Sequence, residues 1–451
     1  MKNRVNLICL ALLSLIISCS DDLDDNIIEQ PIELIVSEDV SVYQSDGFYN
    51  GYTLIAPVNS TNSYLINMEG FVVKKWESEH RTISATLNEQ GELIRSYEVI
   101  NPVFSFGGRT GGIEKFDFEG NLIWNWEYSS PQYTLHHDIH ALPNGNFLAS
   151  VWDLKDANEA IENGRDINLL TDDAVWGERI IEVKPIGTND AEIVWQWELW
   201  DHIIQDYDAT KQNFGVVSEN PQKVDLNYTS GIANLSHVNS LFYIEEFDQI
   251  VFSSRRFDEL MIIDHSTTIA EAKTSNGGTY GKGGDLLYRW GNPNAYKSAL
   301  ETDKLLFGQH DVTYIGNSPN QGGNFMCFNN SRSTTESSVD EIAIPMSTDG
   351  SYTLSPSIAN EPSDYSWSYV SSDIYAPRVS GAKRLANGNT LITQGTEGTL
   401  HEIDASGTVV WKYTIPLEVN DVFKCYRYAS DFPLFNGNVL PILGDGLIIE
   451  E

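Results

Sequence analysis

The sequence predicts an all-β fold, a six-bladed β-propeller with long loop insertions. One pattern recurs along the chain: an alternating apolar run, a turn of the Asn-Gly or Asp-x-x-Gly type, and an aromatic-rich strand, as in 116–126 and 402–413. The segments 142–148 and 385–391 are nearly the same hairpin, and Asn-Gly suits its turn because both turn residues need positive φ. Repeats of short strands are typical of propellers, since one blade cannot bury its faces alone.

The blades are expected to be longer than four strands require. Long helical periodicity is absent, and only 157–163 and 295–302 are expected to form short helices. The surplus residues are therefore assigned to insertions at 203–233 and 334–362, and loops of that length are usually functional lids or decoration. The aromatic residues of the repeats are expected to pack between blades. We place the six blades near 53–77, 84–128, 136–202, 237–293, 309–370 and 380–416.

The first residues are expected to be an export signal. Residues 1–18 have a charged start and an apolar run, and the Ile-Ile-Ser-Cys that ends at Cys19 resembles a bacterial lipobox, which predicts a lipoprotein signal peptide and lipidation of Cys19. An ordinary cleaved signal is the alternative. The acidic run that follows resembles the surface-export signal of some Gram-negative lipoproteins, or is a solvated tether. We therefore expect an exported outer-membrane lipoprotein, periplasmic or cell-surface, attached only by its lipid. Its parts are an acidic tether and lead-in over 19–50 and the propeller domain over 51–451.

The charge of the chain excludes some partners. It has 28 Lys and Arg against 64 Asp and Glu, a formal net charge of −36. Such acidity repels phosphates, so nucleic acid and anionic lipid surfaces are not expected partners. An anionic substrate would therefore need a local positive pocket. After the signal and Cys19, the remaining cysteines are Cys327 and Cys425, which form either a disulfide in an exported protein or two buried thiols.

Histidines mark three blades at the same place, the start of the expected innermost strand. His136 and His137, His237, and His310 hold these positions. Innermost strands line the central channel, so these side chains are expected to meet in one pocket at its mouth. Arg255 follows His237 by one hairpin and should return to the same region. A guanidinium beside several imidazoles, with few nearby carboxylates, predicts an anion site.

The residue types of this pocket suit group transfer. Neutral imidazole is a competent nucleophile near pH 7, and a second imidazole can act as a general acid or base. Alternation along a strand lets only one of His136 and His137 face the channel, and the sequence leaves open which one. Asp138 and Asp311 each follow a His, and we expect them to fix backbone rather than relay protons.

These motifs resemble those of the bacterial aryl-sulfate sulfotransferases, the arylsulfotransferase (ASST) family. The similarity extends over nearly all of the chain after the signal, including 52–57, 281–293 and 426–428. The motifs that carry the resemblance are His136-His137-Asp138, His237-Val238-Asn239-Ser240, Ser253-Ser254-Arg255 and Gln309-His310-Asp311.

The resemblance implies a six-bladed propeller that moves a sulfuryl group from an aryl sulfate ester to a phenolic acceptor, without a nucleotide sulfate donor, a cofactor or a metal. It implies that His310 attacks sulfur and holds a transient sulfohistidine. The other His and the Arg then stabilise the sulfuryl oxygens, and one His moves the proton. The catalytic residues that it assigns are His310, His237, Arg255, His137 and His136, with Asn239 as a substrate-binding donor.

Two other functions stay open on the sequence. A non-catalytic surface propeller would bind sulfated or phenolic ligands in the same channel, because binding and catalysis need nearly the same anion donors. A metal-dependent propeller lyase would need a carboxylate or Gln to complete a His ligand set. Gln309 is the obvious candidate for that role, and Arg255 beside a metal cation is unfavourable.

Overall fold

The chain divides into two units, Met1–Ile35 and Val36–Glu451, and the second contains every strand described below. The predicted signal peptide and Cys19 lie outside the described residues, so the lipoprotein and its outer-membrane location stay predictions. In the described part of the chain, no helix is long and apolar enough to cross a membrane. The structure is a computed structural model that describes residues 35–170, 173–318, 322–416 and 421–443.

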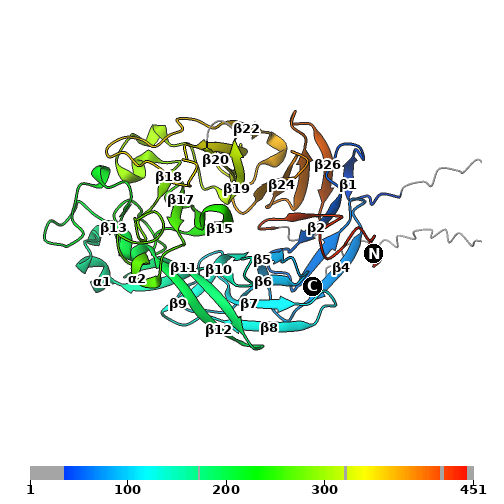
Figure 1. Ribbon diagram of the computed structural model, residues 1–451, viewed down its shortest axis with the longest axis horizontal. Helices are drawn as coiled ribbons and strands as arrows, with labels where there is room; N and C mark the ends of the chain where they lie inside the picture. Colours follow the sequence, from blue (N-terminus) through cyan, green and yellow to red (C-terminus); the bar gives the residue numbers. More distant parts are fainter. Residues whose placement is uncertain (1–34, 171–172, 319–321, 417–420, 444–451) are drawn as a thin grey trace, which may run out of the picture. The chain divides into compact units, whose positions relative to one another are not determined.

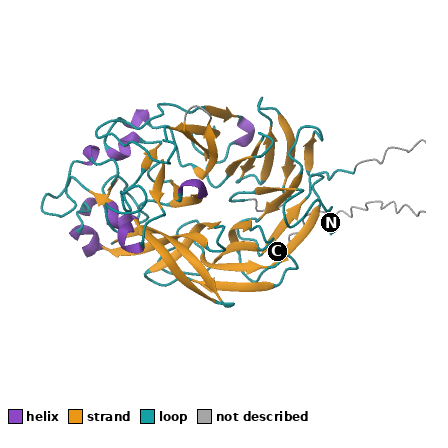
Figure 2. Cartoon of the chain, in the orientation of Figure 1, coloured by secondary structure: helices purple, strands orange, loops and turns teal. Residues whose placement is uncertain are grey.

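Strands make up most of the regular structure, and the short helices lie in the connections between them (Figure 2). Among the described residues, the strands form six antiparallel blades of four strands, one of which carries a fifth strand, and a separate two-stranded ladder. The first strands of successive blades contact one another: β5 (Thr82–Leu87) with β9 (Tyr133–Ala141), β9 with β15 (Val238–Ile244), and β15 with β19 (His310–Ser318). The protein is therefore the six-bladed propeller that the sequence predicted.

Each blade lies within a few residues of its predicted bounds, because the turns that separate the strands are local sequence signals. Blades 1 to 3 contain β2 (Gly51–Ile55), β3 (Asn62–Ile66) and β4 (Val72–Glu77); β5, β6 (Leu93–Glu98), β7 (Gly111–Phe116) and β8 (Leu122–Glu127); and β9, β10 (Phe147–Asp156), β11 (Ala174–Ile186) and β12 (Asp190–Glu198). Blades 4 to 6 contain β15, β16 (Gln249–Ser254), β17 (Glu259–Asp264) and β18 (Tyr288–Trp290); β19, β20 (Gly322–Asn329), β21 (Ser338–Ile344) and β22 (Trp367–Val370); and β23 (Gly381–Arg384), β24 (Thr390–Gln394), β25 (Thr399–Ile403) and β26 (Val409–Thr414).

The two ends of the described propeller close the ring. β27 (Tyr426–Ala429) pairs with β2 and is the innermost strand of blade 1. β1 (Val40–Tyr43) pairs with β26 as the fifth strand of blade 6, and Figure 1 shows blue β1 beside orange β26. The propeller therefore begins before residue 51, where the sequence analysis placed its boundary. Because β27 follows Phe423 closely in the chain, the pairing of β27 with β2 also brings the phenyl side chain of Phe423 to the channel.

Tryptophans on the outer strands connect neighbouring blades. Each is buried, and each indole Nε1 donates to a backbone carbonyl of the next blade, which satisfies the polar end of a large apolar side chain. The packing role expected for these aromatics is therefore confirmed. The bonds are Trp76 to Asp117 (2.9 Å), Trp124 to Asp190 (2.9 Å), Trp197 to Gly284 (2.7 Å), Trp290 to Pro362 (2.7 Å) and Trp411 to Met68 (2.8 Å).

The connections differ from the prediction in two places. A helix forms near 157–163, but 295–302 forms two 3-10 turns instead of one helix. The second insertion is shorter than predicted, because β21 occupies part of 334–362 and the connection to β22 runs over 345–366. Short elements in the connections are α1 (Ala157–Glu162), η1 (Ile167–Leu169), η2 (Leu199–His202), β13 (Ile203–Ile204), η3 (Val217–Glu219), β14 (Val224–Asp225), η4 (Glu245–Phe247), α2 (Ile269–Ala272), η5 (Pro293–Tyr296), η6 (Glu301–Asp303) and η7 (Ser372–Ile374).

Cys327 and Cys425 are both buried and free, so of the two alternatives the structure contains thiols and no disulfide between them. Burial raises the pKa of the Cys425 thiol to about 12 and that of the Cys327 thiol well above its ordinary value. Both thiols therefore stay protonated and unreactive, and they belong to the core.

Candidate active site

Three of the predicted histidines and the predicted arginine line one cavity of about 560 Å³. His137 lies on β9, His237 directly precedes β15, and His310 is the first residue of β19. Arg255 directly follows β16, which pairs with β15, so the hairpin returns it to the same end of the channel as expected. Four side chains from three blades therefore converge where the innermost strands begin.

The backbone at these positions leaves the regular strand conformation. His137 and His237 have φ of 48° and 51°, and Asp311, next to His310, has φ of 57°. His137 and Asp311 each lie at an irregularity in the pairing of an inner strand with its neighbour, and His237 lies two residues before one. Left-handed backbone is costly for residues other than Gly and gathers at functional sites. The bulges turn side chains into the pocket that simple alternation would direct elsewhere.

The structure places His137 on the pocket wall and His136 behind it. Nδ1 of His136 lies 2.9 Å from Nδ1 of His137, and its Nε2 lies 2.5 Å from Oε1 of Glu178. The ring of His136 also stacks on Trp152, with centroids 4.3 Å apart. His136 is therefore fixed on both nitrogens and on one face, and it reaches the pocket only through His137.

The hydrogen bonds of His310 define where its ring proton lies. The amide Nδ2 of Asn330 donates to the carbonyls of Ala376 (2.9 Å) and Val379 (2.8 Å), so its Oδ1 is turned to Nδ1 of His310 at 2.7 Å. Oδ1 accepts, and Nδ1 of His310 therefore carries the proton. The lone pair of the neutral ring is then on Nε2.

His237 has the opposite tautomer. Oδ1 of Asn234 accepts from the backbone N–H of His237 (3.0 Å), which turns Nδ2 of the amide to Nδ1 of the same His at 2.8 Å. Nδ1 therefore accepts, and Nε2 carries the proton. The pocket thus holds one imidazole with a free lone pair and another with a free N–H donor.

Burial keeps these imidazoles neutral. It lowers the pKa of His310 to about 4, with a further contribution from Arg255. It lowers the pKa values of His137 and His237 well below the ordinary value, and the neighbouring His and Arg charges act in the same direction. At neutral pH the three rings are therefore uncharged.

The remaining charges of the wall leave one guanidinium unbalanced. Arg109 pairs with Glu98, and Arg378 pairs with Asp421 at 3.0 Å. Within the described residues, the guanidinium of Arg255 has no ion pair and no hydrogen bond. The wall therefore offers a single free cation beside neutral donors, which suits an anionic group of one charge, such as a sulfate monoester.

Two aromatic rings flank the imidazoles. Phe423 packs edge-on against His310, with centroids 6.3 Å apart, and lies 6.2 Å from the ring of His137. Phe106 packs edge-on against His237 at 5.6 Å and is 40% exposed at the mouth. The pocket therefore has apolar surface for an aromatic ring next to its anion donors.

The structure does not bring Asn239 to the pocket wall. Its side chain is fully buried, and its Nδ2 donates to the backbone carbonyl of Gln309 (2.7 Å). The side-chain amide of Gln309 in turn donates to Ser253 Oγ (3.0 Å) and the carbonyl of Glu259 (3.0 Å). Both side chains therefore fix the backbone at Gln309, next to His310. Neither side chain lines the pocket, where a sulfate oxygen or a metal would bind. Among the described residues, no group of three or more His, Cys, Asp and Glu could hold a metal ion.

The two Asp residues of the motifs fix backbone, as expected. Asp138 accepts from the N–H of Leu241 (2.9 Å) and Asp311 from that of Ala382 (3.1 Å), each on the next blade. The ammonium of Lys424 lies 2.6 Å from Asp138 and 3.6 Å from Asp311. These buried ion pairs cross-link inner strands directly beneath the pocket.

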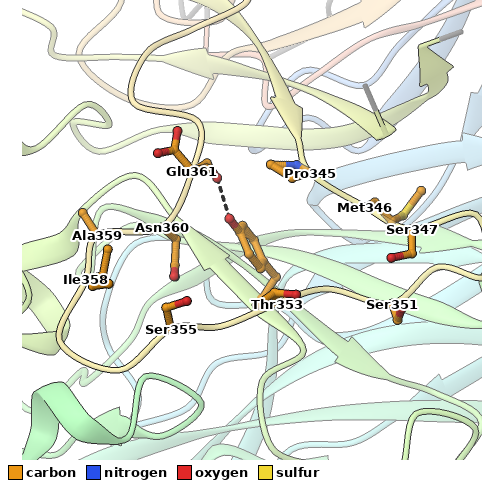
Figure 3. Close-up of a pocket in the computed structure, with 11 residues that line it drawn as sticks. Pro345, Met346, Ser347, Ser351, Thr353, Ser355, Ile358, Ala359, Asn360 and Glu361 are labelled. Atoms are coloured by element: carbon orange, nitrogen blue, oxygen red, sulfur yellow. Dashed lines mark hydrogen bonds between the residues drawn. The ribbon is translucent and has the colours of Figure 1, made fainter. Parts of the chain in front are cut away.

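Two other cavities lack an unbalanced cation. One of about 440 Å³ lies beside the connection 345–366, and Figure 3 shows Asn360 on one side of it and Ser347 on the other. Tyr288, which also lines it, donates to the carbonyl of Glu361 (2.5 Å). No Arg, Lys or His lines it. The other, of about 520 Å³, has three cations, each paired with a carboxylate: Lys383 with Asp311 (2.6 Å), Arg384 with Glu341 (2.9 Å) and Arg427 with Glu402 (3.0 Å).

Sequence reasoning missed the residues that set the tautomers. Asn234 and Asn330 lie in short polar segments next to strands, and Glu178 interrupts the apolar alternation of β11. A carboxylate at an inward position of a buried strand is the one signal that would have drawn attention to Glu178, since such a charge needs a partner.

Fold and site together define a β-propeller protein with a pocket suited to an anionic group. The model of the family described as arylsulfotransferase (ASST) matches residues 41–422. The chain belongs to this family, whose membership implies aryl-sulfate sulfotransferase activity on aryl sulfate substrates.

Solved structures resemble the chain only in fold. A Bacteroides caccae protein of unknown function is 13% identical, with a TM-score of 0.45 over 83% of this chain and 98% of that one. The Cps50 (Swd1) β-propeller domain of Myceliophteria thermophila is 11% identical, with a TM-score of 0.43 over 85% and 92%. Virginiamycin B lyase from Staphylococcus aureus is 9% identical, with a TM-score of 0.37 over 84% and 89%. No curated protein matches the chain.

Proposed function

We propose that the chain transfers a sulfuryl group from an aryl sulfate ester to a phenol through a sulfohistidine at His310, without a nucleotide sulfate donor. The observation that carries this proposal is the tautomer of His310. Asn330 holds its Nδ1–H, so the lone pair of a neutral ring is presented on Nε2 beside the unpaired guanidinium of Arg255.

In the first half of the reaction, Nε2 of His310 attacks sulfur and the bond from sulfur to the aryl oxygen breaks. The electron pair of that bond leaves with the phenolate. The sulfated ring keeps its Nδ1–H on Asn330, so its positive charge offsets the negative sulfuryl oxygens. In the second half, the oxygen of the acceptor phenol attacks sulfur, and the N–S electron pair returns to Nε2.

Arg255 and the Nε2–H of His237 are the donors for the sulfuryl oxygens in both halves. Such donors are fixed before the reaction and lie in a buried site, where they stabilise developing charge more strongly than water does. His137 exchanges the proton of the leaving or attacking phenol. Phe106 and Phe423 supply the contact for the aryl ring.

Incubation of the purified chain with a chromogenic aryl sulfate, with and without a phenol, tests this proposal. We expect phenol-dependent release of the chromogenic phenolate and formation of the sulfated acceptor. A chain that binds the aryl sulfate but releases nothing at any pH from 6 to 9 would be the non-catalytic binding protein instead.

The pH dependence of the first half reaction follows from the pKa of His310, which is lowered to about 4. The nucleophile is the neutral ring, so the active form predominates at every pH above that value. We expect the rate of the chromogenic burst to be constant from about pH 8 to 6 and to fall as pH decreases toward about 4, instead of falling near 6.5 as for an exposed His. A rate that halves between pH 6 and 7 contradicts the assignment.

Acid also lowers stability, because the unfolded chain binds protons below about pH 6.5 that the buried native His residues do not bind. Return of each acid-treated sample to pH 7 separates the two effects. Full recovery of activity shows that the loss came from titration in the native state.

Gly108 is expected to be required for the position of His137. It has φ of 87°, and a Cβ at this residue would lie 2.0 Å from Nε2 of His137. Gly108→Ala should therefore displace the ring and reduce kcat/KM by about 100-fold, the cost of a small misplacement at a reacting group. A Cβ added at Gly107 would have no other atom within 4 Å. Gly107→Ala is therefore the matched control and should keep activity within about twofold. Equal activity of the two variants would show that His137 does not act through this position.

A further inference from the structure

Three buried side chains form a continuous chain of hydrogen bonds that ends at the pocket. Oε1 of Glu178 lies 2.5 Å from Nε2 of His136, and Nδ1 of His136 lies 2.9 Å from Nδ1 of His137. Their residue exposures are 1%, 1% and 5%. Only His137, the last of the three, lines the cavity.

The orientation of Glu178 is set by its second oxygen. Oε2 accepts from Oγ of Ser236 (2.7 Å) and from the backbone N–H of Val238 (3.2 Å), both at the start of the neighbouring blade. Oε1 is therefore the oxygen that faces His136. Because Trp152 also holds the ring of His136 by stacking, no member of the chain is free to turn away.

We infer that Glu178 and His136 form a proton relay that lets His137 act as an acid in one half of the reaction and as a base in the other. This inference rests on the proposed two-step sulfuryl transfer. It assigns Glu178 as a positioning residue that stores the proton and acts only through the two imidazoles.

The two states of the relay differ by one proton at the pocket. In the first, Oε1–H of Glu178 donates to Nε2 of His136, Nδ1–H of His136 donates to His137, and Nε2–H of His137 faces the pocket. When that last proton moves to the leaving phenolate, each proton behind it shifts by one bond. The second state then has an ionised Glu178, two neutral rings and a lone pair on Nε2 of His137.

The attacking phenol reverses these shifts. Its proton goes to Nε2 of His137, the Nδ1 proton of His137 moves to His136, and the Nε2 proton of His136 returns to Glu178. Burial supports the first state at rest, because it raises the pKa of Glu178 well above the ordinary value and lowers that of His136 well below it. The relay is then uncharged when the anionic substrate enters.

Glu178→Gln tests the relay because it imitates the protonated carboxyl group and cannot release the proton. The N–H of Val238 requires an oxygen, so the amide oxygen takes the place of Oε2 and the NH2 group donates to His136. His137 is then locked with its proton on Nε2. We expect the burst with a nitrophenyl sulfate to stay within about threefold, since nitrophenolate can leave without an acid. Before transfer to phenol, the native relay gives its pocket proton to the departing nitrophenolate or to solvent and so becomes a base. The variant cannot release this proton, so its transfer to phenol should fall by about 100-fold.

A purely structural role of Glu178 predicts a different dependence on the acceptor. A phenol acidic enough to be ionised at the assay pH needs no base, so it should remove most of the difference between Glu178→Gln and the native chain. Equal slowing of the burst and the transfer, no slowing of either, or the same defect with ionised and un-ionised phenols would overturn the inference. Absence of any sulfated His310 in the native chain would instead contradict the proposed function.

Two further variants complete the test. Glu182→Gln changes the same residue type on the same strand, and Glu182 bonds His265 (3.0 Å) outside the pocket, so both steps should stay within about twofold. His136→Phe keeps a flat ring against Trp152 but breaks the proton path, and it should reproduce the loss of transfer to phenol. This variant also decides the question if Glu178→Gln does not fold.

Discussion

His310→Ala is expected to reduce phenol-dependent sulfuryl transfer by about 10⁴-fold or more, because it removes the covalent nucleophile and leaves only the binding donors. The chromogenic burst in the absence of acceptor should also disappear, since no sulfated enzyme can form. Binding of the aryl sulfate should remain, because Arg255 and His237 are untouched. Stopped-flow release of the phenolate and calorimetric binding measure these two quantities separately.

His80→Ala is the control for His310. His80 stacks on Tyr97, with centroids 4.3 Å apart, and does not line the cavity. Its replacement should leave the burst and the turnover close to native values. If His310→Ala kept the burst while its melting temperature and binding were native, another residue would be the nucleophile.

Arg255→Ala is expected to lower kcat/KM for the aryl sulfate by about 10³-fold, at the upper end of the effect of removing one fixed donor from an oxyanion site. The effect should be large because Arg255 is the one cation of the described pocket wall that has no carboxylate partner. Both kcat and the affinity for an aryl sulfonate, which resembles the substrate but cannot react, should fall. Arg255→Lys should recover only part of the loss, since an ammonium lacks the planar fork.

Arg256 provides a matched control at the next position of the chain. Its guanidinium donates to the carbonyl of Ser230 and does not line the cavity. Arg256→Ala removes a half-buried side chain that does not reach the pocket, so kcat/KM should stay within about twofold. Equal losses in the two variants would mean that Arg255 acts through the general field or through stability rather than through contact with the sulfuryl group.

Most of the blade pattern could be predicted because its signals are local. An Asn-Gly turn such as that of 142–148 marks a hairpin within a few residues, and the Trp residues mark the outer strand of a blade. The closing strands β27 and β1 could not be placed in the same way, because each pairs with a strand from the opposite end of the chain. Such pairing leaves no periodic signal, and the boundary at residue 51 was set too late for this reason.

Part of the site could also be predicted, because some of its residues follow the repeat pattern of the blades. His237 and His310 occupy equivalent places in the repeat, and Arg255 returns to the same end of the channel by one hairpin, so the repeat pattern brings the three together. The choice between His136 and His137 depends on a bulge with left-handed backbone, which strand alternation does not describe. Asn239 does not line the described pocket, and its Nδ2 instead donates to the backbone carbonyl of Gln309.

The tautomer of His310 and the partner of His136 were beyond the sequence because they depend on neighbours distant in the chain. Asn330 lies 20 residues after His310, and Glu178 lies 42 residues after His136. Each is oriented by its own second set of bonds, to carbonyls or N–H groups of other segments. The lone pair on Nε2 of His310 therefore depends on contacts between segments that are far apart in the sequence.

The net charge of −36 describes the surface of the protein and does not describe its pocket. The field of the surface repels an anionic substrate, although salt screens it over about 8 Å at physiological ionic strength. The pocket wall pairs two of its three guanidiniums and leaves Arg255 free, next to the rings of Phe106 and Phe423. Local charge and aromatic contact, rather than attraction by the surface, are therefore the terms that favour binding.

Mass analysis of the enzyme after mixing with an aryl sulfate alone tests the central claim most directly. The peptide that contains His310 should gain the mass of one SO₃ group in an acid-labile form, and a phenol added afterwards should discharge it at the rate of turnover. Label on a different residue, or steady turnover with no label on His310 at any time after mixing, would contradict the account.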